Sequence, residues 1–116
     1  IAPRPHNSGH HSIEGFETSQ FAQLNRILLG LELGSMALKC PSAMINIVGP
    51  EDFSGTYQLA ENVYWETQKD VFVHIYGKSE TRPNRKLGHV TVTAEDLEKL
   101  LLRAQEVQTK LRIIPS

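Results

Sequence analysis

The sequence has little cysteine and no long apolar run. Cys40 is the single cysteine among 116 residues, which excludes an intrachain disulfide and a cysteine-based zinc site and favours a reducing compartment. No activating base stands beside Cys40, which we interpret as a small packed residue. No apolar stretch approaches the roughly 20 residues of a membrane-spanning helix, and no signal peptide is visible. We therefore expect a cytoplasmic protein without a membrane partner.

An excess of charge of either sign is also missing. The formal net charge is −1, so no global field attracts nucleic acid or acidic lipid, and any anion site must be local. No glycine-rich phosphate loop, G-x-S-x-G or H-E-x-x-H motif occurs, and the aromatic residues do not alternate with basic ones as in RNA-binding proteins. With 40% hydrophobic and 22% charged residues, the composition is typical of one small globular domain. The chain begins with Ile1 inside a dense polar motif, which leads us to expect a piece of a longer protein.

Two segments have the spacing of amphipathic helices. Thr18 or Ser19 can cap a helix over about 19–29, which carries apolar residues on one face and stops near a glycine. Thr93 is the predicted cap of a second helix, with Asp96 as a weaker capping-box partner.

The remaining segments predict strands, so the expected fold class is α+β. Alternation within 71–77 places Phe72, His74 and Tyr76 on one face and the branched aliphatic residues on the other. Residues 51–68 are compatible with either a short helix or an irregular loop. The other predicted extended segments are residues 1–17, where a strand runs into an irregular loop, residues 42–48, residues 87–92 and an apolar tail at 111–116.

The first group of chemically capable residues lies in the string PRPHNSGH at 3–10. Arg4 offers a planar fork of donors, His6 can exchange a proton near neutral pH, and Asn7 supplies an amide. In an extended segment Arg4 and His6 point to the same face, and the two prolines stiffen that geometry. The alternative is a proline-rich connector with solvated side chains.

The second group lies in the string KSETRPNRKLGH at 78–89. Its four cationic residues oppose Glu80 alone, which leaves a local charge of +3, and Pro83-Asn84 forms a turn that brings the ends together. Cations on such a turn suit a phosphate ester, because arginine binds it with two parallel bonds and lysine as a point charge. A solvated loop tip is the alternative. The cationic residues are Lys78, Arg82, Arg85 and Lys86.

A third group, the histidines at positions 6, 10 and 11, could supply imidazole ligands to a metal ion. No Cys, Asp or Glu accompanies them within this stretch, and zinc sites use three or four protein ligands. We therefore disfavour a metal site here.

The first two motifs resemble those of the 5-(carboxyamino)imidazole ribonucleotide synthetases, a family of ATP-grasp ligases. In that family a segment reading Ala-Pro-Arg-Pro-His-Asn-Ser-Gly-His precedes a helix with Thr-Ser-Gln-Phe. A later strand reads His-x-Tyr-Gly-Lys and leads to Arg-Pro-x-Arg-Lys-x-Gly-His. The resemblance covers about residues 1–93. The matching positions are Ala2 to His10, Thr18 to Phe21, His74, Tyr76 to Lys78, Arg82, Pro83, Arg85, Lys86, Gly88 and His89.

The resemblance implies an enzyme of purine biosynthesis that joins ATP, bicarbonate and aminoimidazole ribonucleotide. It implies that Arg4, His6 and Asn7 act on carboxyphosphate, and that Lys78, Arg85 and Lys86 bind the ribonucleotide, chiefly its 5′-phosphate. The family's Mg²⁺-binding Glu would stand just before Ile1, so no metal ligand is expected in this chain.

Further expectations concern the whole enzyme. Residues 1–34 would be the end of an ATP-grasp domain and residues 35–116 a small β-rich C-terminal domain of the barrel-sandwich hybrid type, closed by a helix. The intact enzyme would be a homodimer, and the fragment would be inactive alone.

Two rival functions remain open. The formate-dependent glycinamide ribonucleotide transformylases share the Pro-Arg-Pro-His start, but their pattern continues with Asp-Thr-Gly, whereas Asn7, Ser8 and Gly9 follow here. A non-catalytic domain could instead use the basic loop to bind an anionic partner.

Overall fold

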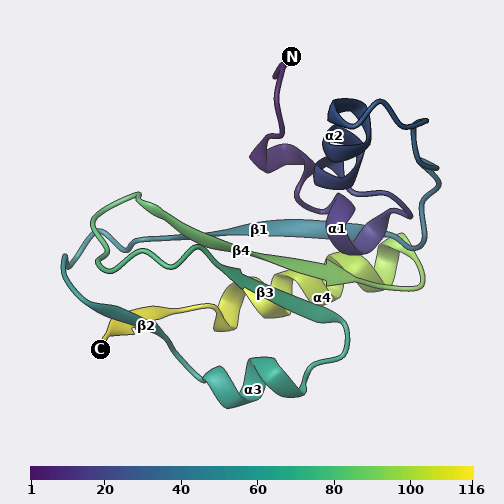
Figure 1. The fold of residues 1–116 in the computed structure, drawn as a ribbon. Helices are drawn as coiled ribbons and strands as arrows, with labels where there is room; N and C mark the ends of the chain where they lie inside the picture. Colours follow the sequence, from purple (N-terminus) through teal and green to yellow (C-terminus); the bar gives the residue numbers. More distant parts are fainter.

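A computed structural model describes residues 1–116 and shows a small α+β fold with two antiparallel sheets (Figure 1). The larger sheet has three strands in the order β1-β4-β3, and the smaller sheet pairs β2 with β5. The strands are β1 (Ser42–Val48), β2 (Tyr57–Leu59), β3 (Val71–Ile75), β4 (Lys86–Thr93) and β5 (Ile113–Pro115). The predicted strands at 42–48, 71–77 and 87–92 are confirmed, as is an edge strand in the C-terminal tail.

The helices differ more from the prediction than the strands do. They are a 3₁₀ turn (Asn7–Gly9), α1 (Ser12–Gly15), α2 (Gln20–Leu28), α3 (Asn62–Thr67) and α4 (Leu97–Lys110). The strand expected at the start of residues 1–17 is not formed, and the irregular loop expected after it contains two short helices. The segment 51–68 contains both a strand and a helix. None of these helices has the length and apolar character needed to cross a membrane.

The caps explain where the two long helices begin. Ser19 Oγ accepts a hydrogen bond from Ala22 N at 3.1 Å, which confirms one of the two predicted caps of α2. The prediction of Thr93 as the cap of α4 was wrong, because Asp96 Oδ1 accepts from Lys99 N at 2.8 Å. Thr93 is the last residue of β4 and pairs with Ser42, so its backbone is committed to the sheet.

Strand β4 lies in the middle of the larger sheet and is covered on both faces. Val90 and Val92 are fully buried on one face and pair with the aliphatic residues of β3. His89 and Thr91 are buried on the opposite face, where His89 pairs with His74 of β3. The alternation predicted for 71–77 is thus the observed one, and it gives the sheet an apolar face and a face with polar groups.

Helix α4 covers the apolar face, and the N-terminal segment covers the other one (Figure 1). Leu100 and Val107 of α4 join the core on the apolar face, together with Trp65 of α3. Trp65 is 4% exposed, and its Nε1 donates to Ala60 O at 2.8 Å. The buried core consists of Ile47, Leu59, Trp65, Val71, Leu87, Val90, Val92, Leu100 and Val107.

Gly88 on β4 allows close contact with the edge strand β3. A Cβ at this position would lie 2.2 Å from His74 O, so a larger residue would push the two strands apart. This close approach holds His74 and His89 in register directly beneath the N-terminal segment.

Candidate functional site

The segment 4–7 enters the fold through a 3₁₀ turn that His6 caps. His6 Nδ1 accepts from Ser8 N at 3.2 Å and lies 3.0 Å from Ser8 Oγ, so one ring nitrogen is held by the turn. The His6 and Arg4 side chains are exposed, and Arg4 Nη1 donates to Pro5 O at 3.2 Å. Both side chains are therefore available to a ligand from the solvent side.

Asn7 and Lys86 join the two motifs, although 79 residues separate them. Lys86 Nζ donates to Asn7 Oδ1 at 3.2 Å. Asn7 Nδ2 is buried without a hydrogen-bond partner, and a buried amide donor left in this way is costly. The Asn7 amide therefore connects the N-terminal segment to the basic motif through its oxygen, while its nitrogen faces the protein interior.

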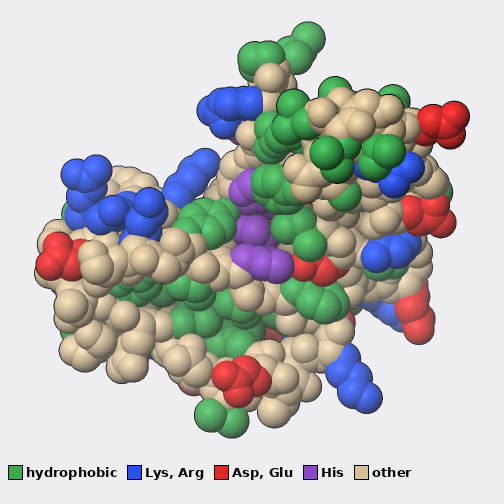
Figure 2. All heavy atoms as spheres, in the orientation of Figure 1, with side chains coloured by type: hydrophobic (Ala, Val, Ile, Leu, Met, Phe, Trp, Pro, Cys, Tyr) green, Lys and Arg blue, Asp and Glu red, His purple; other side chains and the backbone are tan.

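The other cations of the basic motif lie on the β3–β4 loop, where Lys and Arg side chains gather at one end of the molecule (Figure 2). Arg85 N donates to Arg82 O at 3.0 Å, which confirms the turn at Pro83-Asn84. Arg85 is half-buried and its Nη1 donates to Glu80 O at 3.0 Å, whereas Lys78 is exposed. Convergence of Lys78 and Arg85 on one anion stays a prediction.

Three adjacent imidazole rings connect the 4–12 segment to the sheet, with the lower two stacked at 18° and the upper two tilted by 38°. We call His10, His89 and His74 the histidine column. The His10 and His89 ring centroids are 4.7 Å apart, and those of His89 and His74 are 4.5 Å apart. At the far end, His74 Nε2 donates to Glu14 Oε1 at 2.6 Å. Figure 2 shows histidine side chains as a continuous band between the N-terminal segment and the sheet.

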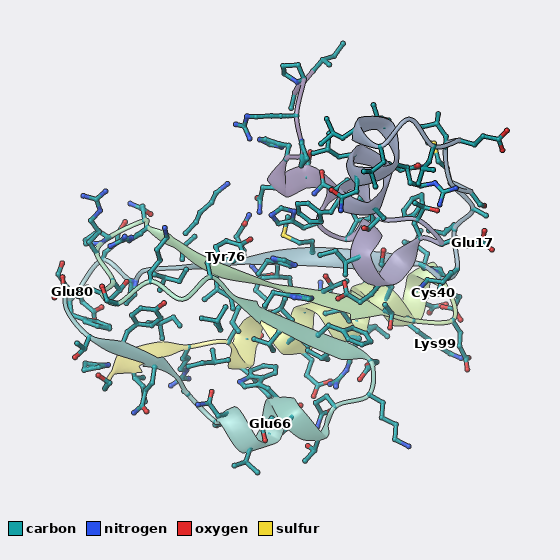
Figure 3. All side chains as sticks on the ribbon, viewed as in Figure 1. Glu17, Cys40, Glu66, Tyr76, Glu80 and Lys99 are labelled. Atoms are coloured by element: carbon teal, nitrogen blue, oxygen red, sulfur yellow. The ribbon has the colours of Figure 1, made fainter.

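His89, in the middle of this column, is held neutral by its surroundings. It is 3% exposed, and burial, reinforced by His74 and His10, lowers its pKa to about 4. Burial also lowers the pKa of His10, with further contributions from His6, His74 and Lys86. The Tyr76 hydroxyl lies 2.9 Å from His89 Nδ1, and Figure 3 shows Tyr76 beside the sheet, with Glu80 at the tip of the loop.

The geometry of the column does not suit a metal ion. The rings meet through their faces, and no group of three or more His, Cys, Asp or Glu side chains is arranged to hold one. Of the three histidines considered as metal ligands, His10 belongs to the column, while His11 Nδ1 lies 3.0 Å from Ser8 O. Cys40 is partly buried and has a free thiol.

We predict that His89 makes stability depend on pH below neutrality. Its pKa is about 4 in the folded chain and about 6.5 when unfolded, so the unfolded state binds more protons between these values. Stability should therefore fall as pH decreases from about 6.5 to 4, in the same direction as the effect of His10. NMR titration of His89, together with urea unfolding at several pH values, measures both quantities. A His89 that titrates near 6.5 would contradict the prediction.

Prediction from sequence missed the column and its neighbours as a unit. His10 was considered as a metal ligand and as part of a family motif, and His74, Tyr76 and His89 as parts of the second family motif, but none of them as members of one cluster. The alternation of 71–77 already put His74 and Tyr76 on one face, which was a usable signal. Gln20 was noted only within the Thr18 to Phe21 motif, and nothing in the sequence indicated that its side chain contacts both His6 and His10.

Comparison with known proteins decides the family. The model of the phosphoribosylaminoimidazole carboxylase C-terminal domain matches residues 42–103, more than half of the chain. The chain belongs to this family. It is 43% identical to the N5-carboxyaminoimidazole ribonucleotide synthase of Synechococcus elongatus over 96% of its own length and 28% of that protein.

Solved structures agree with this family membership. The N5-carboxyaminoimidazole ribonucleotide synthetase of Thermotoga maritima superposes with a TM-score of 0.91 at 42% identity, covering 99% of this chain and 32% of that one. The synthase of Aspergillus clavatus, solved in complex with ADP and 5-aminoimidazole ribonucleotide, gives 0.75 at 31% identity, covering 91% and 28%. The chain thus spans about three tenths of the length of the relatives it matches.

Proposed function

We propose that the protein containing this chain is an ATP-dependent ligase that carboxylates 5-aminoimidazole ribonucleotide with bicarbonate in purine biosynthesis. The observation that carries the proposal is the contact between Lys86 and Asn7, because it joins the two family motifs into one surface. Arg4 and His6 lie on the same segment as Asn7, and both side chains are exposed. A chain that merely used a basic loop to bind anions would not require this connection.

In the proposed reaction, bicarbonate is first activated by ATP as carboxyphosphate. The Arg4 guanidinium would hold the phosphate oxygens with parallel bonds, and Asn7 would lie at the same site, where it contacts Lys86. When the new C–N bond forms, the phosphate leaves and the amine loses a proton, which His6 is placed to accept. Lys78, Arg85 and Lys86 would bind the ribonucleotide through its phosphate.

The residues of this chain do not fit Mg²⁺, because cations, an imidazole and an amide make up the candidate site and no carboxylate cluster is present. We propose that the intact ligase binds Mg²⁺ and most of the ATP elsewhere, including a Glu just before Ile1. The homodimer and the cytoplasmic location expected from the resemblance stay predictions.

We further propose that residues 1–34 end an ATP-grasp domain and residues 35–116 form a β-rich domain of the barrel-sandwich hybrid type. The support is an apolar surface on and after α2 that this chain does not cover. Large apolar side chains that are exposed in such number within one segment are typical of an interface. Its exposed residues are Ile27 (59%), Leu28 (74%), Leu29 (72%), Leu31 (54%), Leu33 (64%), Met36 (71%) and Leu38 (56%).

The test uses the full-length protein. We expect release of ADP and phosphate that depends on both bicarbonate and aminoimidazole ribonucleotide, with the N-carboxylated ribonucleotide as product. Activity with formate and glycinamide ribonucleotide instead would support the transformylase rival. Binding of ribose 5-phosphate without any turnover would support an anion-binding domain and remove the ligase proposal.

A further inference from the structure

The side chain of Gln20, the first residue of α2, holds the backbone of His6 at two points. Gln20 Oε1 accepts from His6 N at 2.9 Å, and Gln20 Nε2 donates to His6 O at 2.8 Å. One planar amide therefore contacts both backbone groups of His6: it is the acceptor for His6 N, and it shares His6 O with Gly9 N, which donates at 2.9 Å. The His6 side chain keeps its freedom toward solvent, while its backbone is fixed.

These two bonds determine which way the Gln20 amide points. A backbone N–H can only donate and a backbone carbonyl can only accept, so Oε1 must face His6 N and Nε2 must face His6 O. The second hydrogen of Nε2 points to His10 Nδ1, 2.8 Å away. His10 Nδ1 must therefore accept, which places the proton of the neutral His10 ring on Nε2. The low pKa of His10, caused mainly by burial, keeps that nitrogen free to accept.

The position of Gln20 is fixed by contacts of its backbone and its side chain. Gln20 N donates to Ser12 Oγ at 3.0 Å, which ties the start of α2 to α1. Gly9 leaves the space that the amide occupies, because a Cβ there would lie 2.6 Å from Gln20 Oε1. His10 stacks on His89 of the sheet, so the hydrogen bonds reach from His6 to β4.

We propose that Gln20 is a positioning residue for His6, holding the segment 4–7 in a fixed place against the sheet. The inference rests on the proposed ligase function, in which His6 exchanges a proton with the reacting groups. Gln20 contacts neither ATP nor the ribonucleotide in this proposal and acts only through the backbone of His6. A displacement of about 1 Å at such a group can cost on the order of 10²-fold in rate.

The chain contains a matched control for the test. Gln23 lies one turn further along α2 and holds Gly34 in the same manner, with Oε1 accepting from Gly34 N at 2.9 Å and Nε2 donating to Gly34 O at 2.7 Å. Gln20→Met and Gln23→Met each remove a pair of hydrogen bonds to one residue's backbone with little change in side-chain volume, and Gln20→Met also removes the bond to His10 Nδ1. Only the first of them frees His6.

In the full-length enzyme, Gln20→Met is expected to lower kcat about 10- to 100-fold and to change KM for ATP and for the ribonucleotide less than about threefold. Gln23→Met should keep kcat within about twofold of the wild type, even if it lowers the melting temperature equally. Gln20→Glu keeps the bond from His6 N but loses both donors, so its kcat should also fall. Equal kcat values for Gln20→Met and Gln23→Met would overturn the proposal.

Hydrogen exchange provides a readout that needs no activity. The His6 amide should exchange at least about tenfold faster in Gln20→Met than in the wild type, whereas Gln23→Met should affect Gly34 instead. If the wild type has no ligase activity but this exchange pattern appears, the proposed function fails and the hydrogen-bond arrangement stands. An unchanged His6 exchange rate in Gln20→Met would overturn the arrangement itself.

Discussion

His6→Ala in the full-length ligase is expected to lower kcat by about 10²–10⁴-fold while KM for ATP and for the ribonucleotide changes little. General acid–base and charge-stabilising groups act mainly in the transition state, so their loss lowers turnover more than substrate binding. The structure is consistent with this role, because the ring is exposed and one nitrogen is held by the turn while the other remains available. Steady-state kinetics with each substrate varied in turn measures the effect.

His11→Ala is the control for this experiment. His11 lies five residues further along the chain, and its Nδ1 contacts Ser8 O. The His11→Ala variant therefore loses an imidazole from the same local segment. Its kcat should stay within about threefold of the wild type. If His6→Ala turns over as fast as His11→Ala, the segment 4–7 is a proline-rich connector, and the chemistry lies elsewhere in the enzyme.

Arg85→Ala is expected to raise KM for the ribonucleotide about 10- to 100-fold and to leave KM for ATP nearly unchanged. A charge-assisted contact to phosphate contributes on the order of 1.5–3 kcal/mol, which gives this range. In the structure Arg85 uses Nη1 for the bond to Glu80 O, so the rest of the guanidinium can still bind a phosphate. Initial rates at saturating ATP and bicarbonate measure the change.

Arg82→Ala serves as the matched control, because it removes an exposed guanidinium from the same loop. Arg85→Lys should rescue only in part, since an ammonium cannot form the two parallel bonds of a guanidinium. An equal rise in KM for both arginine variants would mean that the loop attracts phosphate only through its general charge. A rise in KM for ATP alone would assign the loop to a different substrate.

The parts of the fold that were predictable depend on local signals. Ser19 and the spacing of apolar residues define α2 because capping and amphipathic periodicity act within a few residues. The start of α4 was misjudged because Thr93 and Asp96 are both good caps, and only the pairing of Thr93 with Ser42 decides between them. Strand β2 has three residues and pairs with β5 at the C-terminal end of the chain, so no local sequence pattern predicts it.

In the candidate site, too, local features could be predicted and contacts between distant residues could not. Its two motifs could be found as strings, because each is continuous in the sequence. Their connection could not, since the Lys86–Asn7 bond and the His10–His89 stack each join residues 79 positions apart. The register of β3 on β4 decides which histidines meet, and it pairs His74 with His89 next to the close approach at Gly88.

Trp65 is the only tryptophan of these 116 residues and is buried in the core. Its intrinsic fluorescence therefore reports on the packing of α3 against the sheet. Its indole lies on the apolar side of the larger sheet, whereas the 4–20 segment covers the other side. Unfolding of the core should shift the emission to longer wavelength as the indole meets water. Detachment of the N-terminal segment should leave the emission unchanged. In a chain of this length, the two events can thus be followed separately without an added label.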